Sequence, residues 1–318
     1  MKKKQIFRGA ATAMITPMDE EGRIRFPVFK KLLEMQIKQQ ADAVVVAGTT
    51  GEASTLTDEE HLELVEFAVK AADGRIPVIA GAGSNNTAHA VYMSKECEKL
   101  GADGLLLVTP YYNKTSQQGL YLHYKECAEA VSLPIILYNV PSRTGVNILP
   151  QTYQRLAEID NITACKEAGG NFSQIAATAA LCGDNLAIYS GNDDQITAVL
   201  ALGGQGVISV LANILPAETH EICEAYFRGE EKRSRELQLY YMELIKALFS
   251  DVNPIPVKEA MRKIGYEVGN CRLPLCDMED SVKEKLYRVL ERYGFFDEMI
   301  RGAAVSETVQ AAVAGGME

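Results

Sequence analysis

The stretch "AVVVAGTTGEASTLTDEEHLELVEFAVKAA" (Ala43–Ala72) carries the signals of a strand, a loop and a helix in direct succession. Its opening run, Ala43–Ala47, is apolar without polar alternation, which is typical of a parallel strand covered on both faces. Thr57 followed by Glu60 forms a capping-box pattern, and apolar residues then recur at helical spacing. The stretch therefore predicts one βα unit in which the polar turn Gly48–Glu52 directly follows the strand.

The same order of signals recurs along the chain as far as Arg228. The apolar, β-rich runs are Gly9–Ile15, Ala43–Ala47, Pro77–Gly81, Gly104–Thr109, Pro134–Tyr138, Ile162–Lys166, Leu186–Ser190 and Gly206–Val210. Eight such units within roughly 230 residues predict a (β/α)₈ barrel, whose usual size is about 250 residues. An open doubly wound sheet is the structural alternative, but parallel strands of even length favour closure. We therefore predict an α/β fold with a TIM barrel over residues 1–228.

After Gly229 the alternation of strands and helices stops. Helical spacing is carried by Leu237, Tyr240, Tyr241, Leu244 and Leu248, and two further helical segments follow Pro256 and Asp280. We predict a C-terminal helical region over residues 229–300 that caps the barrel and is not a second catalytic domain. Residues 301–318 are rich in small side chains and lack a large apolar face, which predicts a flexible tail.

The composition restricts the class of protein. Of 318 residues, 47% are hydrophobic and 23% are charged, and the formal net charge of −10 argues against a nucleic-acid surface. No apolar run reaches the about 18–20 residues of a membrane span, and no apolar segment follows the opening MKKK as in a secretory signal. Seven cysteines without a C-x-x-C pair indicate free thiols in a reducing cytoplasm. The four histidines are scattered, so we expect no metal site and no cofactor.

Polar residues cluster where the predicted strands end. Gly48–Glu52 (GTTGE) follows the second strand, Thr109–Asn113 (TPYYN) the fourth and Tyr138–Gly145 (YNVPSRTG) the fifth. Lys166 ends the sixth strand, and Ser190–Asp193 (SGND) follows the seventh. The carboxyl ends of barrel strands lie on one face, where catalytic groups gather, so we expect these clusters to converge there.

Each cluster also has a purely structural interpretation. Lys166 could pair with Glu167, although neighbours on a strand point to opposite faces and make that pairing geometrically poor. Gly81–Asn86 (GAGSNN) lacks the third glycine of a dinucleotide loop and the ending of a P-loop, so we interpret it as a tight βα turn. The other candidates, which could serve only in packing, turns or solvated loops, are Thr49, Thr50, Tyr111, Tyr112 and Arg143.

The chemistry of a lysine at a buried strand end favours catalysis. An ordinary lysine has a pKa near 10.4, so only roughly one in 2,500 is neutral at pH 7. Desolvation at an apolar strand end lowers that pKa, and the neutral amine of Lys166 can then attack a ketone to form a Schiff base. Tyr138, at the adjacent strand end, is placed to shuttle protons, and the loop of Thr49 and Thr50 can hold a carboxylate. These residues predict a class I aldolase-type site that needs no metal.

Several separated motifs resemble one family and keep its order. They are GTTGE, TPYYN, YNVPSRTG, KEAGGN, GGQGVISV and, at Asn253–Lys258, NPIPVK. The resemblance, which runs from about Arg8 to about Phe296, is to the dihydrodipicolinate synthase (4-hydroxy-tetrahydrodipicolinate synthase) family. It implies a lyase of lysine and diaminopimelate biosynthesis that condenses pyruvate with L-aspartate 4-semialdehyde.

The resemblance also implies roles for single catalytic residues. Lys166 is the lysine that captures pyruvate as a Schiff base, and Tyr138 donates and accepts the proton. Thr49 links Tyr138 to Tyr112 in a proton relay. In the family that second tyrosine enters from a neighbouring subunit, which makes the active site dependent on a dimer. The resemblance favours a homotetramer built as a dimer of dimers, although the sequence does not decide between dimer and tetramer.

Three further residues are implied in substrate binding. Thr50 holds the pyruvate carboxylate with the main chain of Ile208 nearby, and Arg143 binds the carboxylate of the semialdehyde, a role that suits a guanidinium. One alternative is another pyruvate-dependent lyase, such as N-acetylneuraminate lyase or a 2-keto-3-deoxy sugar-acid aldolase, but Arg143 favours an acidic acceptor. The other alternative, a non-catalytic ligand-binding barrel, does not explain the complete set of lysine, tyrosines and threonine.

In feedback-inhibited relatives, lysine binds at the dimer interface near the loop after the second strand. Residues here that match that pocket are Ser54, His61, Asn85 and Tyr111. Asp58 and His89 depart from it, because inhibited relatives typically carry histidine at the first position and glutamate at the second. Losing that glutamate removes a charge-assisted partner for an ammonium group, so we predict weak or absent inhibition by lysine.

Overall fold

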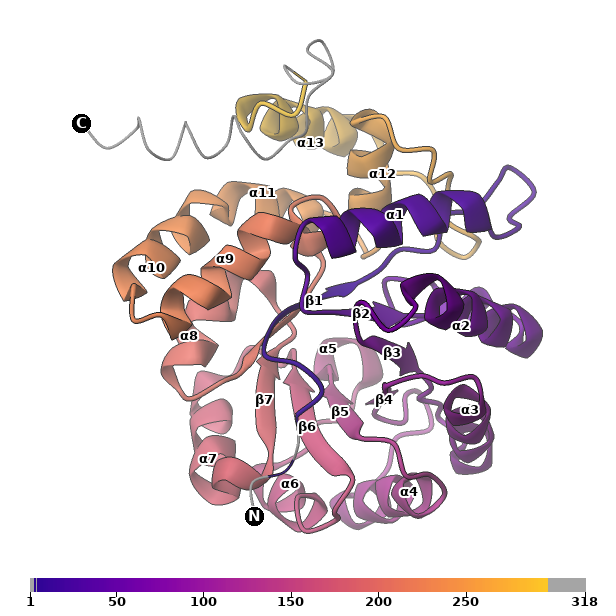
Figure 1. Ribbon diagram of the computed structural model, residues 1–318, viewed down its shortest axis with the longest axis vertical. Helices are drawn as coiled ribbons and strands as arrows, with labels where there is room; N and C mark the ends of the chain where they lie inside the picture. Colours follow the sequence, from indigo (N-terminus) through magenta and orange to yellow (C-terminus); the bar gives the residue numbers. More distant parts are fainter. Residues whose placement is uncertain (1–2, 4, 297–318) are drawn as a thin grey trace.

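The computed structural model describes residue 3 and residues 5–296, and its centre is a closed barrel of eight parallel strands (Figure 1). Strands that are neighbours in the sequence are neighbours in the barrel, and the last strand pairs with the first. The strands are β1 (Gly9–Ala13), β2 (Ala43–Val46), β3 (Val78–Gly81), β4 (Gly104–Val108), β5 (Ile135–Asn139), β6 (Ile162–Glu167), β7 (Ala187–Ser190) and β8 (Gly206–Ser209). The predicted TIM barrel is confirmed, and the open sheet is excluded.

Helices surround the barrel and return the chain to the start of the next strand (Figure 1). They are α1 (Phe26–Lys38), α2 (Asp58–Ala72), α3 (Thr87–Lys99), α4 (Gln117–Glu129), α5 (Pro141–Thr144), α6 (Pro150–Leu156), α7 (Phe172–Cys182), α8 (Ile196–Ala201) and α9 (Pro216–Phe227), with 3₁₀ turns η1 (Ala53–Thr55), η2 (Gly183–Asn185), η3 (Asp193–Gln195) and η4 (Leu211–Asn213). The expected capping box is present, because Thr57 Oγ1 accepts from the Glu60 N–H at 3.2 Å while the Glu60 carboxylate accepts from the Thr57 N–H at 3.0 Å. The segment Gly81–Asn86 is a βα turn, and its Asn86 caps α3.

Side chains along each strand alternate between two apolar layers, as a pleated strand requires. One layer fills the inside of the barrel and includes Ala11, Val45, Ile79, Leu106, Ile136, Ala164 and Ile208. The other packs against the surrounding helices and includes Ala10, Val44, Val78, Leu105, Leu137, Cys165 and Val207. This alternation decides which side chains at the strand ends face the barrel axis.

The barrel closes where β1 meets β8, and two glycines make the closure possible. Gly206 has φ +144°, and a Cβ on it would overlap the carbonyl of Gly9. Gly9 has φ +117°, and a Cβ there would overlap the carboxylate of Asp42. Both conformations are ones that only glycine adopts readily. A side chain at Gly206 would therefore prevent β8 from approaching β1 to hydrogen-bonding distance, and one at Gly9 would displace the Asp42 carboxylate.

The helical part after α9 consists of α10 (Glu231–Tyr240), α11 (Met242–Leu248), α12 (Ile255–Lys263) and α13 (Asp280–Arg292). It lies along one side of the barrel, with α12 and α13 beyond α1 (Figure 1). The helical spacing at 237–248 is divided between α10 and α11, because the chain leaves helical geometry at Tyr241. The ring of Tyr241 is buried there, 5.8 Å from that of Tyr293. The predicted tail, 301–318, lies outside the described residues.

Two expectations about the environment of the chain can be compared with the structure. No helix in the described part combines the length and the apolar content that crossing a membrane demands. All seven cysteines lie within that part, and each is a free thiol as expected.

Candidate active site

A cavity of about 390 Å³ lies at the carboxyl end of the barrel. Its walls come from the segments that follow β2, β3, β4 and β5, and they include the predicted site residues Thr49, Tyr138 and Arg143. The segments after β2, β4 and β5 therefore meet at this end of the barrel, whereas Lys166 and residues 190–193 are not among the residues that line the cavity. The volume is large enough for small organic acids.

Lys166 lies next to this cavity, near the end of β6, and is 6% exposed. It is two residues after Ala164, an inner-layer residue, so its side chain points into the barrel. Burial lowers the pKa of Lys166 to about 8, although the carboxylate of Asp193 opposes the shift. At this pKa roughly one lysine in ten is a neutral amine at pH 7. The amine is thus several hundred times more available as a nucleophile than that of an ordinary lysine.

Glu167 points the other way, which excludes the structural pairing with Lys166. Its carboxylate accepts from the Tyr153 hydroxyl at 2.5 Å and from Asn139 Nδ2 at 3.0 Å, both outside the barrel interior. Burial raises the pKa of Glu167, and these hydrogen bonds partly offset the rise. The geometric argument made from the alternation of side chains is therefore confirmed.

Tyr138 on β5 is the neighbour of Lys166 in the barrel, because the two residues are paired in the register of β5 and β6. The Lys166 ammonium lies 4.5 Å from the centre of the Tyr138 ring. Burial raises the pKa of the Tyr138 phenol, while Arg143 and a hydrogen bond with the Thr49 side chain act against the rise. Tyr138 therefore keeps its proton near neutral pH, beside a lysine that readily loses one.

The loop Gly48–Glu52 brings Thr49 and Thr50 to the same region. Thr50 is buried, and its Oγ1 accepts a hydrogen bond from Asn253 Nδ2 at 3.0 Å. Because its oxygen accepts that bond, the Thr50 hydroxyl keeps its own hydrogen free to donate to an anion. Ile208 lies in the inner layer of β8, close to fully buried.

Arg143 is held by the main chain of the helical extension. It lies in the short helix α5, and its Nη2 donates to the Asn253 carbonyl at 3.1 Å. Its guanidinium has further N–H groups, which leaves capacity for a carboxylate.

Tyr112 is not brought together with the other predicted residues within this chain. Its side chain is 91% exposed, and its backbone has φ +69°, a left-handed conformation that is uncommon for a bulky residue. Tyr111 beside it lines the cavity, and its carbonyl accepts from Asn85 Nδ2 at 3.1 Å. Backbone strain at an exposed aromatic residue is a recurrent mark of a functional position.

Sequence reasoning missed the role of Asp193. The residue is 1% exposed, and its Oδ2 accepts from the N–H groups of Val210 at 3.0 Å and Leu211 at 2.9 Å. Burial raises its pKa, and the charge of Lys166 acts in the opposite direction. The sequence marked Asp193 as part of the polar cluster SGND after the seventh strand. It did not indicate that the Asp193 carboxylate would interact electrostatically with Lys166.

Most of the residues that match an effector pocket border the same cavity. Of the four matching residues, Ser54, His61 and Tyr111 line it and Asn85 does not. Asp58 and His89, which depart from the pocket of inhibited relatives, line it as well. The ring of His89 lies within hydrogen-bonding distance of both Asp58 carboxylate oxygens, at 3.0 and 3.1 Å. The charge of Asp58 is therefore engaged by the very histidine that departs from the inhibited pattern.

Among the described residues, one group has the spacing of a metal site, and it lies at the other end of the barrel. It consists of Asp42, His220 and Glu224, whose potential ligand atoms lie within 4.8 Å of one another. Asp42 Oδ2 is already occupied, because it accepts from the Ala10 N–H at 2.7 Å and from His220 Nδ1 at 2.8 Å. These contacts make the group an internal ion pair that joins β2 to α9.

Comparison with known proteins gives one consistent family. Residues 6–293 match the model of the dihydrodipicolinate synthetase family. Over 289 residues the chain is 56% identical to 4-hydroxy-tetrahydrodipicolinate synthase of Caldicellulosiruptor saccharolyticus, which spans 91% of this chain and 98% of that protein.

Two solved structures illustrate the structural similarity. One is the chloride-inhibited dihydrodipicolinate synthase from Acinetobacter baumannii complexed with pyruvate, with a TM-score of 0.88, 42% identity and coverage of 90% of this chain and 98% of that one. The other is a monomeric dihydrodipicolinate synthase variant, with a TM-score of 0.89, 42% identity and coverage of 91% and 98%. The whole fold described above is therefore shared.

Proposed function

The chain belongs to the dihydrodipicolinate synthetase family, and on this premise we propose that it is a 4-hydroxy-tetrahydrodipicolinate synthase. As such it is a lyase of lysine and diaminopimelate biosynthesis that condenses pyruvate with L-aspartate 4-semialdehyde. The single observation that carries the chemistry is the buried Lys166, whose lowered pKa of about 8 and contact with Tyr138 provide a neutral amine next to a proton donor.

In the first half of the reaction, Lys166 Nζ attacks the ketone carbon of pyruvate, and water leaves as the imine forms. Tyr138 donates its proton to the departing oxygen, and the imine then loses a methyl proton to become an enamine. The Thr50 hydroxyl, which is free to donate because its oxygen accepts from Asn253, binds the pyruvate carboxylate. The main chain of Ile208 borders the same position.

In the second half, the enamine carbon attacks the aldehyde carbon of the semialdehyde. Arg143 binds the carboxylate of this second substrate through paired N–H donors. The amine of the substrate then attacks the imine carbon, which closes the ring and releases Lys166 as a free amine. Thr49, hydrogen-bonded to Tyr138, carries protons between Tyr138 and Tyr112.

Borohydride reduction in the presence of pyruvate tests the covalent step. We expect mass spectrometry to find one pyruvate-derived adduct, located on Lys166. Because the neutral amine is the nucleophile, the rate of capture should increase about tenfold per pH unit below pH 8 and level off above it. Absence of an adduct would contradict the proposal and favour a non-catalytic ligand-binding barrel.

A competition between acceptors tests the second substrate. With pyruvate fixed, we expect turnover with L-aspartate 4-semialdehyde and little with N-acetylmannosamine or sugar-acid acceptors. Preference for a sugar acceptor would instead assign the chain to the lyases that share the lysine and tyrosine. The observation that favours the semialdehyde is the guanidinium of Arg143 at the wall of the cavity.

We further propose a homotetramer, a dimer of dimers, in which Tyr112 enters the site of a neighbouring subunit. Two observations support the entry of Tyr112 into another subunit: the side chain is 91% exposed within its own chain, and its backbone has φ +69°, an uncommon conformation for a bulky residue. Tyr112→Phe should lose activity while fold and assembly survive, because only the hydroxyl is removed.

Mixing two inactive variants tests the exchange of tyrosines. Tyr112→Phe supplies an intact Lys166, and Lys166→Ala supplies an intact Tyr112, so hybrid dimers should regain part of the activity. No recovery after verified subunit exchange would place the tyrosine in the site of its own subunit.

A further inference from the structure

We propose that Lys258, in the helical extension, is a positioning residue for pyruvate binding. It acts through a buried ion pair with Glu52, which ends the substrate loop Gly48–Glu52. The inference rests on the proposed function, since Thr49 and Thr50 belong to this loop. It assigns to the extension a part in substrate recognition as well as the covering of the barrel.

The ion pair between Lys258 and Glu52 is closed to solvent. Their side chains are 1% and 0% exposed, and the distance from Lys258 Nζ to Glu52 Oε1 is 2.8 Å. Lys258 Nζ also donates to the carbonyls of Thr16 at 3.1 Å and Asn270 at 2.7 Å. All three hydrogens of the ammonium therefore have partners, and these lie on three separate segments that meet at this point.

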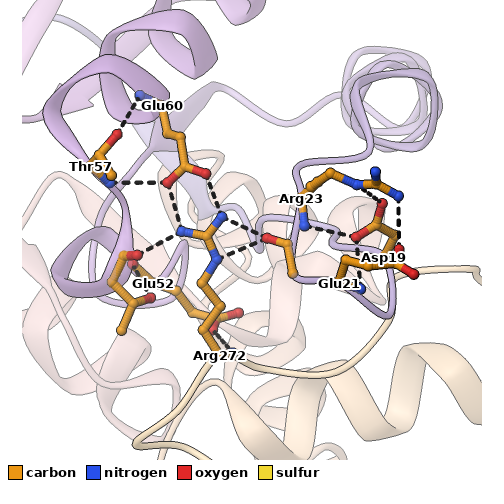
Figure 2. Close-up of polar contacts among 9 residues, drawn as sticks. Asp19, Glu21, Arg23, Glu52, Thr57, Glu60 and Arg272 are labelled. Carbon is orange, nitrogen blue, oxygen red and sulfur yellow. Dashed lines mark hydrogen bonds and ion pairs between the residues drawn. The ribbon is translucent and has the colours of Figure 1, made fainter.

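The second carboxylate oxygen of Glu52 is fixed as well. Glu52 Oε2 accepts from the Arg272 N–H at 2.8 Å. The Arg272 side chain lies against Glu60, at the start of α2, and donates to the Thr55 carbonyl at 2.6 Å (Figure 2). Glu52 itself has φ +58°, so the chain makes a left-handed turn where the loop ends. The C-terminal end of the loop Gly48–Glu52 is thus fixed by the hydrogen bonds of the Glu52 side chain and by the left-handed conformation of its main chain.

Hydrogen bonds connect the anchored Glu52 and the segment around Lys258 to Thr49 and Thr50. The Glu52 N–H donates to the Thr49 carbonyl at 3.1 Å, so the carboxylate and the relay residue belong to one turn. At the other end, Asn253 Nδ2 donates to the Thr50 hydroxyl oxygen. Asn253 lies two residues before α12 and Lys258 lies within it, so this one segment of the chain contacts the loop at two points. A displacement of Lys258 should therefore move the donors that face pyruvate.

Stability alone is a poor explanation for this pair. Replacing a buried ion pair with apolar groups of similar size is often neutral or stabilising, whereas removing one partner leaves a buried charge uncompensated. The pair is nevertheless built with complete hydrogen bonding over a separation of 206 residues. Its fixed geometry at the loop is what an apolar pair would not reproduce.

The test compares Lys258→Met with the double variant Lys258→Met/Glu52→Gln. For each variant, the pyruvate concentration that gives half-maximal adduct at Lys166 is measured, together with KM for both substrates and the melting temperature. Gln36→Met is the matched control, because Gln36 is a buried polar residue whose hydrogen bonds go to Thr12 and Ala212.

We expect both Lys258 variants to need about tenfold or more pyruvate for half-maximal capture, since small misplacements of binding groups have effects of this size. KM for the semialdehyde should change less than threefold. The double variant should melt within about 4 °C of the wild type, because it buries no unpaired charge. Gln36→Met should melt lower with unchanged pyruvate capture.

Other outcomes overturn the proposal. A double variant that captures pyruvate like the wild type, or that does not fold, would show that the pair serves the fold and not the loop. Equal losses for both substrates would likewise remove the specific role in pyruvate binding. An unmodified wild-type Lys166 would contradict the proposed function itself, so the two failures are distinguishable.

Discussion

Two clusters of polar groups at opposite ends of the barrel, the one around Lys166 and the pair of Asp42 and His220, differ in the charge state that their surroundings favour. At the carboxyl end, burial lowers the pKa of Lys166 and raises those of Tyr138 and Asp193, so each shift favours the neutral form. At the amino end, Asp42 raises the pKa of His220, a shift that favours the charged form. Inside the barrel, the ring of Phe7 stacks on that of Tyr189 with 4.3 Å between the ring centres.

This contrast indicates how one fold separates reactivity from stability. The groups around Lys166 are held in states that cost folding free energy but make proton transfer and nucleophilic attack easier. Groups at the amino end are paired and packed, which is the usual division of labour in barrels of this kind. Substitutions at the two ends should therefore change different measurable quantities.

The largest effect on activity should come from replacing Lys166. Lys166→Ala should abolish borohydride-trapped pyruvate, because no other described residue at the site offers a comparable amine. Lys166→Met should at the same time increase the free energy of unfolding at pH 7, by on the order of 3 kcal/mol at most, because an ammonium whose pKa is lowered to about 8 is costly to bury.

The sign of this second effect can be checked by varying pH. The penalty for burying Lys166 is fully present below pH 8 and disappears as the pH rises to the ordinary value of 10.5. Chemical denaturation of Lys166→Met and wild type across this range measures the difference. An adduct that persists in Lys166→Ala at near wild-type yield would contradict the assignment.

Arg143→Ala should separate the two substrates within the carboxyl end. We expect turnover of the semialdehyde to decrease far more than pyruvate capture, because the guanidinium is assigned to the second substrate. A buried charge contact of this kind is worth about 2–5 kcal/mol, but Arg143 is exposed in this chain, so we expect a loss of about 2 kcal/mol or less. Steady-state kinetics with each substrate varied in turn measures this effect. Equal losses of kcat/KM for pyruvate and for the semialdehyde would show that Arg143 has a structural role.

A smaller effect is expected at the rim of the cavity, where lysine could bind as an inhibitor. The carboxylate of Asp58 is paired with His89, and position 89 offers no carboxylate for an ammonium group. The affinity should therefore be roughly ten- to hundredfold weaker than in relatives with glutamate there. Initial rates across a lysine titration decide the matter, and half-inhibition below about 1 mM would show that a well-formed site exists.

The smallest effect should come from the amino end. His220→Gln should leave kcat and pyruvate capture unchanged but reduce stability by less than about 1 kcal/mol, because solvent screens the pair. The contribution of protonated His220 is fully present below its ordinary pKa of 6.5 and is lost as the pH rises through the raised value in the fold. Chemical denaturation of His220→Gln and wild type at pH 6 and pH 9 measures this contribution. A variant that loses activity without losing stability would contradict a purely structural role for His220.

The sequence predicted most of the barrel because each of its units is a local pattern. Apolar runs, the capping box at Thr57 and the polar turns after the strands all act over a few residues, and all are present in the structure. The direction of Lys166 also followed from the alternation of side chains. The break in the long helical spacing at Tyr241 did not follow from the sequence, because the spacing of apolar residues continues across that position.

The contacts across the barrel could not be predicted in this way. Glu52 and Lys258 both stood in motifs that the sequence showed, yet nothing local indicates that they pair over 206 residues. Asp193 likewise faces Lys166 only because β6 and β7 are neighbours in a closed sheet. The sequence shows which polar residues are present, but the partner of each one depends on how the strands are arranged in the closed barrel.

The two glycines at the junction of β1 and β8, Gly9 and Gly206, restrict which substitutions this sequence can accept. Most positions accept several residue types at a moderate cost, whereas Gly9 and Gly206 face a carboxylate and a carbonyl at contact distance, and a single methyl group has no space at either. In a library that samples every substitution, these two sites should tolerate none, whatever property is selected. Both positions should therefore remain glycine in any variant that keeps the barrel closed.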